Sequence, residues 1–555
     1  MEKDRRIEEI KGMLAYQKEL RAKSDEDRWA AMAYVRHRTP SQTMKDDCPV
    51  QEMSHLYSSA GVDSFDTFIS GFMGSIMSQN QEWFTPRLVA KDYSSKIDPA
   101  YGISFLDACK NAMNDEMSHS NFYSEEELAS RDAVSGGYSC TLVQNNEKAG
   151  RIFLQTLAPW RCYFDSDLQG NWNLFMYEYR LNGYELLEKF PDIDKSSDIY
   201  RDASVGKTSR SFSMLYMITE RNRLRDSDGR IMAFGRNKKY AVLEICLDRD
   251  QILYEGGSDD FPVAIHVWQK SGDSQYGVGL VMKYLPEFRK LDRLGYEYGL
   301  AVAKINHSPW LVPDSMMDSF SDDPEARIAY QSREIIPIQL QENIDIASAG
   351  NALVAQEQAI RKMMFNDLFS YLSNTDKVYT ATQVNAVKSE SMSKLAPLYG
   401  NIQIQKIDPM LKMIYMIMVK NRRLIPDPQY VGKTAQTKIA FILDSSMSQM
   451  LANYSKSNSA SIIIDYISAM LQMKITSVVD NINTDNLIRD VMISSGAPAS
   501  FFVDATERDK KRQEQQQMAM MQMQMQNALT ESEINRNNAG AANLNNIAGN
   551  NGGEQ

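Results

Sequence analysis

The sequence lacks the features that mark a disulfide-rich or a DNA-coating protein. Its five cysteines are odd in number and widely spaced, with no Cys-x-x-Cys pair, so they indicate neither a disulfide framework nor a zinc site and favour a reducing compartment. Positive charge is in deficit, because 61 Lys and Arg stand against 72 Asp and Glu and give a net charge of -11. This balance disfavours a protein that neutralises phosphates over a broad surface, although it allows one past which DNA slides.

Long apolar runs are also missing. The longest lies in residues 407–424, where Lys412 interrupts it, and it is shorter than the roughly twenty apolar residues that cross a bilayer. Residues 1–29 are charged throughout and contain no apolar segment of a signal peptide, so we expect no secretory signal. We therefore expect no membrane partner.

Recognisable catalytic and nucleotide-binding motifs are missing too. The fragments 206–208 and 432–434 contain the Gly-Lys-Thr of a phosphate loop, but the glycine needed five residues earlier is replaced by Arg201 and Asp427, so we interpret both as polar loops. The histidines are not at metal-ligand or triad spacing: His37, His55, His119, His266 and His307. The paired carboxylates precede prolines and are typical of turns: Asp259-Asp260 and Asp322-Asp323. We expect no enzymatic activity, no metal and no cofactor.

What the chain does contain is the composition of an ordinary globular protein. With 43% hydrophobic and 10% aromatic residues it can build a sizeable core, and its 555 residues are too many for one core, so we expect three or four structural regions. The C-terminal end differs. A Gln- and Met-rich helix is expected up to residue 525, and the Asn/Gly tract over 526–555 has too little apolar surface to fold alone, so we predict that it is disordered.

The hydrophobic period divides the rest of the chain. Apolar residues at helical spacing predict helices, the third with a break near Ser118 to Ser124: residues 1–47, 65–76 and 102–134. From Gly136 to residue 270 the period becomes two, and turn residues separate seven segments, which predicts a mixed or antiparallel sheet with one short helix at 183–190. The expected fold class is α+β.

The stretch 268–372 is the one around which we expect the rest to be organised. It predicts a helix over 277–306, a polar excursion over 307–350 and a helix over 351–372, which together form a hairpin-like pillar. Two further helices are expected after it, one stopped at Pro397 and one over 409–424. The first pillar helix has polar residues on most faces and only a narrow apolar stripe: Leu285, Leu291, Leu294, Tyr298, Leu300 and Ile305. Such a helix needs neighbours of its own kind, or a wet surface.

The pillar also carries a set of cations: Lys283, Arg289, Lys290, Arg293 and Lys304. They are interleaved with Asp and Glu at steps of three and four residues, which is typical of ion pairs within or between helices. Contact with DNA is the alternative interpretation.

Three segments share their order and spacing with a known family. The first is FISGFMGSIMSQNQEWFTPRL, and the second is NFYSEEELASRDAVSGGYSCTLVQ continued by PWRCYFDSDLQGNW. The third is WQKSGDSQYGVGLVMKYLPEFRKLD followed by NHSPWLVP and YTATQVNAVKSE. Over roughly residues 55–430 this order resembles the head-to-tail connector, or portal, proteins of short-tailed, double-stranded DNA bacteriophages. The chain departs from the family at 309–310, where Pro-Trp replaces Pro-Pro, and in its Asn-rich tail, which has no counterpart.

The resemblance implies an architecture in which copies of the chain, commonly twelve, form a ring. It assigns the segments as follows: 1–270 N-terminal helices and an α/β wing, 271–306 first stem helix, 307–350 clip, 351–372 second stem helix, 373–379 tunnel loop, 380–436 wing helices, 437–525 crown and 526–555 tail. The tunnel loop would present four residues to DNA, with the lysine as the phosphate contact: Asn374, Thr375, Asp376 and Lys377. The cations of the pillar would lie on the channel face of the stem.

The resemblance also implies a function and partners. The ring would stand at one capsid vertex of the virion, after assembly in the host cytoplasm, and double-stranded DNA would be packaged and ejected through it. The expected partners are other copies of the chain, the terminase motor, a tail adaptor, and the major capsid and scaffolding proteins. A tail adaptor or internal core protein is the alternative, and a packaging ATPase is a third hypothesis that the missing phosphate loop disfavours.

Overall fold

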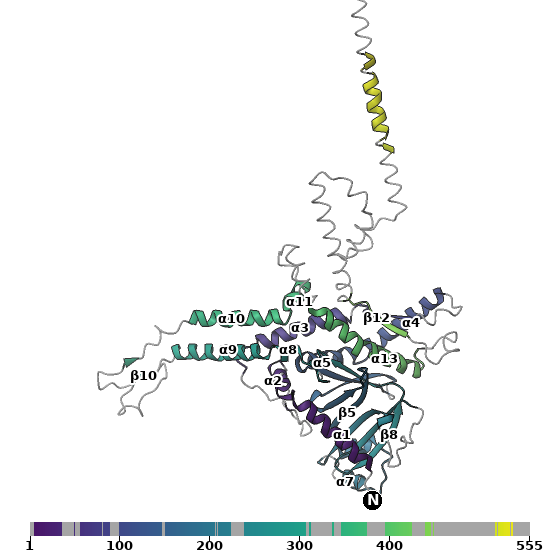
Figure 1. Ribbon diagram of the computed structural model, residues 1–555, viewed down its shortest axis with the longest axis vertical. Helices are drawn as coiled ribbons and strands as arrows, with labels where there is room; N and C mark the ends of the chain where they lie inside the picture. Colours follow the sequence, from purple (N-terminus) through teal and green to yellow (C-terminus); the bar gives the residue numbers. More distant parts are fainter. Residues whose placement is uncertain are drawn as a thin grey trace, which may run out of the picture. The chain divides into compact units, whose positions relative to one another are not determined.

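The computed structural model describes most of the chain: residues 5–35, 56–88, 99–223, 238–306, 346–373, 394–424, 439–445 and 517–536, apart from gaps of one to three residues inside these ranges, with Pro49, Ser448, 310–311 and 336–337. The chain divides into two units, residues 1–449 and 450–555, which are described separately. The first unit combines helices with antiparallel sheets (Figure 1), so the predicted α+β class is confirmed.

A five-stranded antiparallel meander forms the larger sheet. Its order is β4-β5-β6-β7-β8, and its strands follow one another along the chain: β4 (Cys162–Ser166), β5 (Trp172–Asn182), β6 (Ser211–Glu220), β7 (Tyr240–Cys246) and β8 (Gln251–Ser258). Alternating residues face opposite sides. One side is covered by α1 (Arg5–Ala22), whose Ile7, Ile10 and Leu14 pack on Leu215 and Leu243.

Two corrections concern helices next to this sheet. The single helix predicted for residues 1–47 is two, α1 and α2 (Asp25–Val35), because the three acidic residues 25–27 favour a new helix N-terminus after the turn at Ser24. Residues 36–47 lie outside the described part. The predicted helix at 183–190 is confirmed as α6 (Gly183–Lys189), but a second one was missed, α7 (Asp198–Val205), which packs with it over β6.

A smaller sheet lies against the meander. Its order is β3-β2-β9, and its strands are β2 (Tyr138–Asn146), β3 (Arg151–Leu157) and β9 (Val263–Val267). The last strand returns after the whole meander to pair with β2, with Cys140 opposite Ile265. Tyr138 of this sheet packs edge-on against Phe164 of the meander, with ring centroids 5.2 Å apart, so the two sheets share one core.

Helices α3 (Ala60–Ile76), α4 (Pro99–Ser118) and α5 (Phe122–Gly136) confirm the helical predictions, including the break after Ser118. The α3 helix buries Phe65, Phe68, Ile69, Phe72 and Ile76. At Gly71 the helix touches Phe369, whose ring would lie 2.2 Å from an added Cβ, whereas Gly74 has nothing within 4 Å. Of these two glycines of α3, only Gly71 makes a close contact with another helix.

The predicted pillar is present as two helices, but each is interrupted. The first consists of α8 (Leu280–Lys283) and α9 (Leu285–Asn306), and the second of α10 (Ile346–Met363) and α11 (Asn366–Ser373). Helices α9 and α10 lie side by side (Figure 1), and we call this pair the pillar. The first break precedes Pro286. Proline has no backbone N–H to donate to the carbonyl of residue 282, and its ring obstructs the preceding turn. The second break contains Phe365 with φ 56°.

The predicted clip is largely outside the described residues. Two dipeptides are described, β10 (Trp310–Leu311) and β11 (Ile336–Pro337), and they pair antiparallel. Because α10 begins at Ile346, the excursion between the helices is shorter than the predicted 307–350.

Beyond the pillar, the helical run 394–402 continues through the π-helical turn η5 (Gln403–Ile407) into α13 (Asp408–Lys420). The prediction that a helix stops at Pro397 is wrong, because residues 394–402 are helical on both sides of this proline. The second predicted helix ends at Lys420 rather than Leu424.

Strand β12 (Ile439–Leu443), predicted as the start of the crown, pairs with β1 (Phe84–Leu88) of the first unit.

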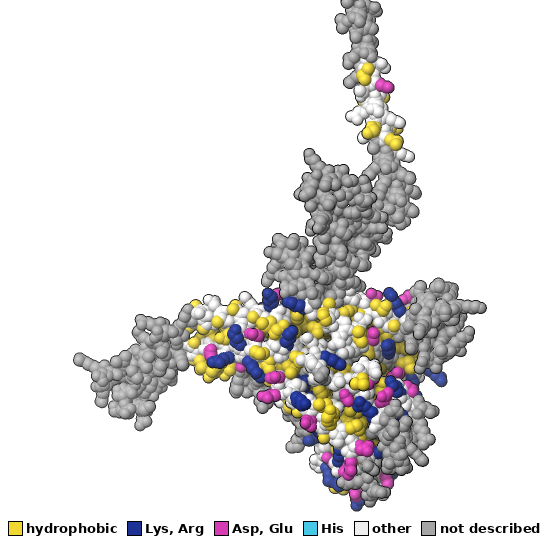
Figure 2. All heavy atoms as spheres, viewed as in Figure 1, with side chains coloured by type: hydrophobic (Ala, Val, Ile, Leu, Met, Phe, Trp, Pro, Cys, Tyr) yellow, Lys and Arg dark blue, Asp and Glu magenta, His cyan; other side chains and the backbone are white. Residues whose placement is uncertain are grey.

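In the second unit, the described residues 517–532 and 534–536 are helical, apart from position 519, and continue past the predicted boundary at 525. All of them are exposed, and Figure 2 shows hydrophobic side chains among them. None of the helices described is long and apolar enough to cross a membrane.

The contact at Gly71 predicts a difference between two neighbouring glycines. Gly71→Ala should lower the free energy of unfolding by about 1–3 kcal/mol, because the methyl group overlaps the buried ring of Phe369. Gly74→Ala should leave it unchanged or raise it by up to about 1 kcal/mol, since alanine is the better helix former and the site is open. Denaturant unfolding of both variants measures the difference, and equal effects would contradict the contact.

Candidate functional site

Arg28 of α2 is fully buried and joins three segments of the chain. Its Nε donates to the carbonyl of Gly136 at 2.7 Å and its Nη2 donates to the carbonyl of Gly277 at 3.3 Å. Its Nη1 lies 2.9 Å from a carboxylate oxygen of Asp25. A buried guanidinium is tolerated only when its donors are satisfied, so Arg28 fixes the end of α5 and the tether before α8 against α2.

The backbones at this point are too close for side chains. Gly137, which ends α5 at φ 94°, would carry a Cβ only 2.2 Å from the carbonyl oxygen of Gly277, and a Cβ on Gly277 would lie 2.7 Å from the carbonyl oxygen of Gly137. Only glycine allows this approach. The Ser-Gly-Gly and Tyr-Gly-x-Gly segments of the sequence are thus two sides of one contact.

Arg21 of α1 binds a third segment in the same way. It donates from Nη1 to the carbonyls of Pro159, Trp160 and Cys162, at 3.3, 2.8 and 3.2 Å. With Arg28 it forms what we call the arginine junction, where the segments that carry the family resemblance meet. The sequence prediction missed both arginines. A partial signal existed for Arg21 alone, which lies seven residues after the buried Leu14 on the same face of α1, but its carbonyl partners are distant in sequence.

The predicted cations of the pillar lie on its exposed surface. Arg289, Lys290 and Arg293 of α9 are exposed, and the buried face of the helix is formed by Leu285, Phe288 and Leu291. Arg293 pairs with Glu297 at 2.8 Å, and Arg289 lies 3.8 Å from Asp27. The expected pairing at a step of four residues is confirmed for Arg293, whereas Arg289 faces a carboxylate of α2.

Most of the other predicted site residues have side chains outside the described part of the chain. Lys304 lies on α9, but its side chain is outside the described part, as are Asn374, Thr375, Asp376 and Lys377 of the predicted tunnel loop. Lys283 is exposed on α8, away from the other pillar cations, and lines a cavity.

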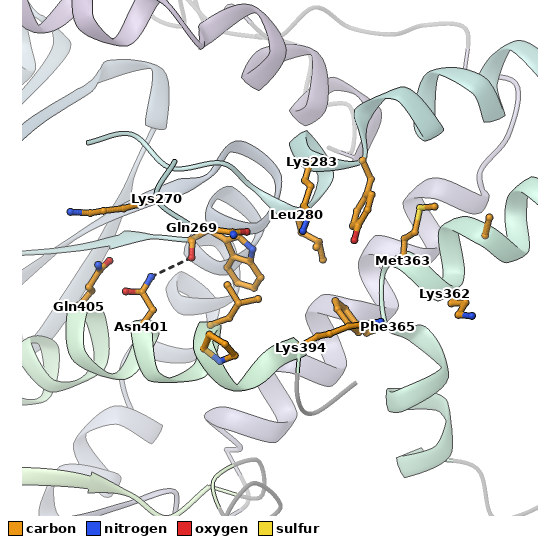
Figure 3. Close-up of a pocket in the computed structure, with 15 residues that line it drawn as sticks. Gln269, Lys270, Leu280, Lys283, Lys362, Met363, Phe365, Lys394, Asn401 and Gln405 are labelled. Atoms are coloured by element: carbon orange, nitrogen blue, oxygen red, sulfur yellow. Dashed lines mark hydrogen bonds between the residues drawn. The ribbon is translucent and has the colours of Figure 1, made fainter. Parts of the chain in front are cut away.

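This cavity has a volume of about 860 Å³ and lies where both pillar helices are interrupted. It is bounded by the end of β9, by α8, by the turn between α10 and α11, and by the run 394–405 (Figure 3). Its lining includes the aromatic side chains of Trp268, Tyr284 and Phe365 and four lysines: Lys270, Lys283, Lys362 and Lys394.

The wall formed by residues 394–405 is held to the outer edge of β9. Asn401 donates from Nδ2 to the carbonyl of Val267 at 2.7 Å, and the N–H of Val267 donates to Oε1 of Gln405 at 3.1 Å. The described residues place no further strand on this edge, and the two side-chain amides satisfy the N–H and the carbonyl of Val267 there.

Lys406, in the π-helical turn, forms a buried ion pair with Glu126 of α5. Both side chains are 0% exposed, and Nζ lies 2.7 Å from Oε2. A π-helical turn adds a residue to the helix and changes the direction in which the following side chains point. Here it directs Lys406 into the protein, where Glu126 compensates its charge.

His266 of β9 is buried beside this pair. Burial first, and the charge of Lys406 second, lower the pKa of His266 to about 3. The imidazole is therefore neutral at physiological pH, and His266 is a residue of the smaller sheet, opposite Ser139 of β2. Exposed His119 follows α4 at a turn, and the remaining histidines lie outside the described residues.

The described cysteines are buried and unpaired: Cys109, Cys140, Cys162 and Cys246. Burial raises the pKa of the Cys109 thiol to about 11 and raises those of Cys140 and Cys246, which makes them poor nucleophiles. Within the described ranges no group of three His, Cys, Asp or Glu side chains could hold a metal.

Comparison with known families identifies the class of protein. Residues 8–503 match the family of bacteriophage head to tail connecting proteins, and the chain belongs to that family. Two relatives share a narrower description. The chain is similar to the probable portal protein of Bordetella phage BPP-1, with 22% identity over 285 residues, and to the portal protein of Salmonella phage epsilon15, with 22% identity over 452 residues.

These similarities cover the relatives to different extents. The match spans 50% of this chain and 51% of the Bordetella phage protein, so only about half the length of that relative is represented. It spans 78% of this chain and 77% of the Salmonella phage protein.

The buried ion pair predicts an asymmetry between single and double substitution. Lys406→Met should lower the free energy of unfolding by about 3–5 kcal/mol, because the Glu126 carboxylate stays buried without a partner. Lys406→Met/Glu126→Leu should recover most of that loss, and exposed Lys412→Met should change it by less than about 0.5 kcal/mol. Denaturant unfolding measures all three, and equal losses in the single and double variants would contradict the pairing.

His266 predicts a pH dependence. Its pKa is about 3 in the folded protein and near 6.5 in the unfolded chain, so its contribution is complete above pH 6.5 and is lost as the pH falls towards 3. Below pH 6.5 the unfolded chain binds a proton that the folded chain does not, which lowers the free energy of unfolding by up to about 1.4 kcal/mol per pH unit.

His266→Gln should flatten this dependence between pH 6.5 and 5, because the buried imidazole is removed. Unfolding of the wild type and of the variant at a series of pH values measures the difference. A slope that is the same in the wild type and in His266→Gln would refute the assignment.

Proposed function

We propose that the chain is a portal subunit, copies of which form a ring around a channel at one vertex of the capsid. Its membership of the head to tail connecting family and its similarity to two phage portal proteins support this proposal. Double-stranded DNA would enter the capsid through the channel during packaging and leave through it on ejection. The ring would hold commonly twelve subunits.

The observation that carries the proposal is the surface of the pillar. Its helices pack on each other along one side, and hydrophobic side chains lie on their surface (Figure 2). Tyr296, Leu300 and Val354 are 43%, 41% and 50% exposed. Exposed apolar side chains on two adjacent helices favour covering by another protein surface. In a ring, the pillar of the next copy is that surface, and the exposed charged residues pair across it or face the channel.

The other segments take roles around this pillar. The sheets and helices of the first unit form the wing, the segment between α9 and α10 forms the clip, and the segment after Ser373 forms the tunnel loop, with Lys377 towards the DNA. The clip meets the terminase motor and later the tail adaptor, while the wing meets capsid and scaffolding proteins. Residues beyond β12 form the crown inside the head.

A channel of this kind needs no catalytic group of its own, because the docked motor hydrolyses ATP. The net charge of -11 favours passage of DNA through such a channel. An acidic protein repels phosphates over most of its surface, so DNA moves along it without being held.

The test is the assembly state of the purified protein. Sedimentation velocity and negative-stain electron microscopy should show rings with a central hole. Leu300→Asp/Val354→Asp should shift the protein to monomers, because charged groups would have to be buried between adjacent pillars. Its circular dichroism should match the wild type, since both side chains are exposed in the monomer.

The matched control is Leu168→Asp, at a fully exposed turn between β4 and β5. It should leave the rings intact. A wild-type protein that stays monomeric at every concentration would refute the proposal, and particles without a hole would favour a tail adaptor or internal core protein instead.

A further inference from the structure

The charged side chains that line the cavity at the helix breaks are all lysines. Lys270 follows β9, Lys283 lies on α8, Lys362 ends α10 and Lys394 begins the run 394–402. Among the described residues that line the cavity there is no Asp or Glu. In a chain with more carboxylates than basic groups, a lining with only positive charge is unexpected for an ordinary surface hollow.

Three of these lysines differ in their partners from the two arginines of the pillar. Arg293 and Arg289 lie near carboxylates. In the part of the chain that the structure describes, Lys270, Lys283 and Lys362 have no carboxylate within ion-pair distance. Lys283 and Lys270 instead lie 5.6 and 5.8 Å from the ring centres of Tyr284 and Trp172. Their charge is therefore not neutralised by a described neighbour.

The lysines approach the cavity from separate elements. Lys283 and Lys394 come from opposite walls, and Lys270 and Lys362 lie towards its two ends (Figure 3). The Nδ2 group of Asn401 and the Oε1 atom of Gln405 are occupied by the edge of β9. The charged groups of the described lining are ammonium groups, which are donors with a full positive charge, and those of Lys270, Lys283 and Lys362 have no described carboxylate partner.

We propose that this cavity binds phosphate groups of the DNA backbone, and that its lysines, rather than the arginines of the pillar, are the main cationic contact of the portal with DNA. The proposal rests on the proposed function and specifies where the DNA is held. Lysine ammonium groups contact phosphate as point charges without reading bases. Such contacts are independent of sequence, as passage of a whole genome requires.

The experiment is the salt dependence of DNA binding by the full-length protein. The logarithm of the association constant for a fluorescent DNA duplex is measured against the logarithm of the salt concentration. Lys283→Gln/Lys362→Gln should reduce the magnitude of the slope by about 2, because each phosphate contact that is lost removes about 0.9 from it. Lys283→Arg/Lys362→Arg should retain the slope.

The matched control is Lys23→Gln/Lys195→Gln, which removes two exposed lysines far from the cavity in sequence. Its slope should equal that of the wild type. An unchanged slope in Lys283→Gln/Lys362→Gln, or an equal reduction in the control, would overturn the proposal. The arginine variant separates loss of charge from loss of fold.

Competition distinguishes the source of the phosphate. Unlabelled duplex should displace the labelled duplex, whereas inorganic phosphate and ATP at equal ionic strength should not. Displacement by ATP at low concentration would overturn the assignment to DNA and favour a nucleotide site. Ring formation is measured separately. If Lys283→Gln/Lys362→Gln forms rings and its slope equals that of the wild type, this inference is refuted and the proposed function still stands.

Discussion

The buried guanidinium group of Arg28 requires hydrogen-bond acceptors inside the protein. The first unit is arranged around the acceptors that this group contacts. The guanidinium is withdrawn from water, so each unsatisfied donor would destabilise the fold. The acceptors are the carbonyls of Gly136 and Gly277 and the carboxylate of Asp25. Residues more than a hundred positions apart are thus fixed within one contact. The tether before α8, and with it the direction of the pillar, depends on this group.

A second buried charge fixes the opposite wall of the cavity. Lys406 is paired with Glu126 on α5, the same helix whose last turn is bound by Arg28. One helix therefore positions both the start of α8 and the run 394–405. Because buried ion pairs add little net stability compared with apolar packing, their main effect here is to specify geometry. The cavity lies between two segments that are each tied to α5 through a buried cation.

The periodic parts of the fold could be predicted from the sequence because their patterns record burial directly. Strands β5, β6 and β7 alternate residues between two packed faces, and α3 places its phenylalanines at steps of three and four. The arginine junction could not be predicted, since the need for Arg21 and Arg28 arises from carbonyls distant in sequence. The same holds for the break at Phe365, where packing next to Phe68 accompanies a left-handed backbone that no local pattern indicates.

The departures from a regular pillar are also what create its cavity. A continuous helix over 280–306 would need Pro286 in its interior, and an unbroken α10–α11 would need Phe365 in a helical conformation. Instead both helices break at the same level, and Tyr284 and Phe365, one from each break, line the cavity. Lys283 and Lys362 lie next to these two breaks in the sequence, at the ends of α8 and α10. In a chain with a net charge of -11, this arrangement brings Lys283 and Lys362, which have no described carboxylate partner, to one level of the subunit. In the proposed ring, that level would be the one that meets DNA phosphates.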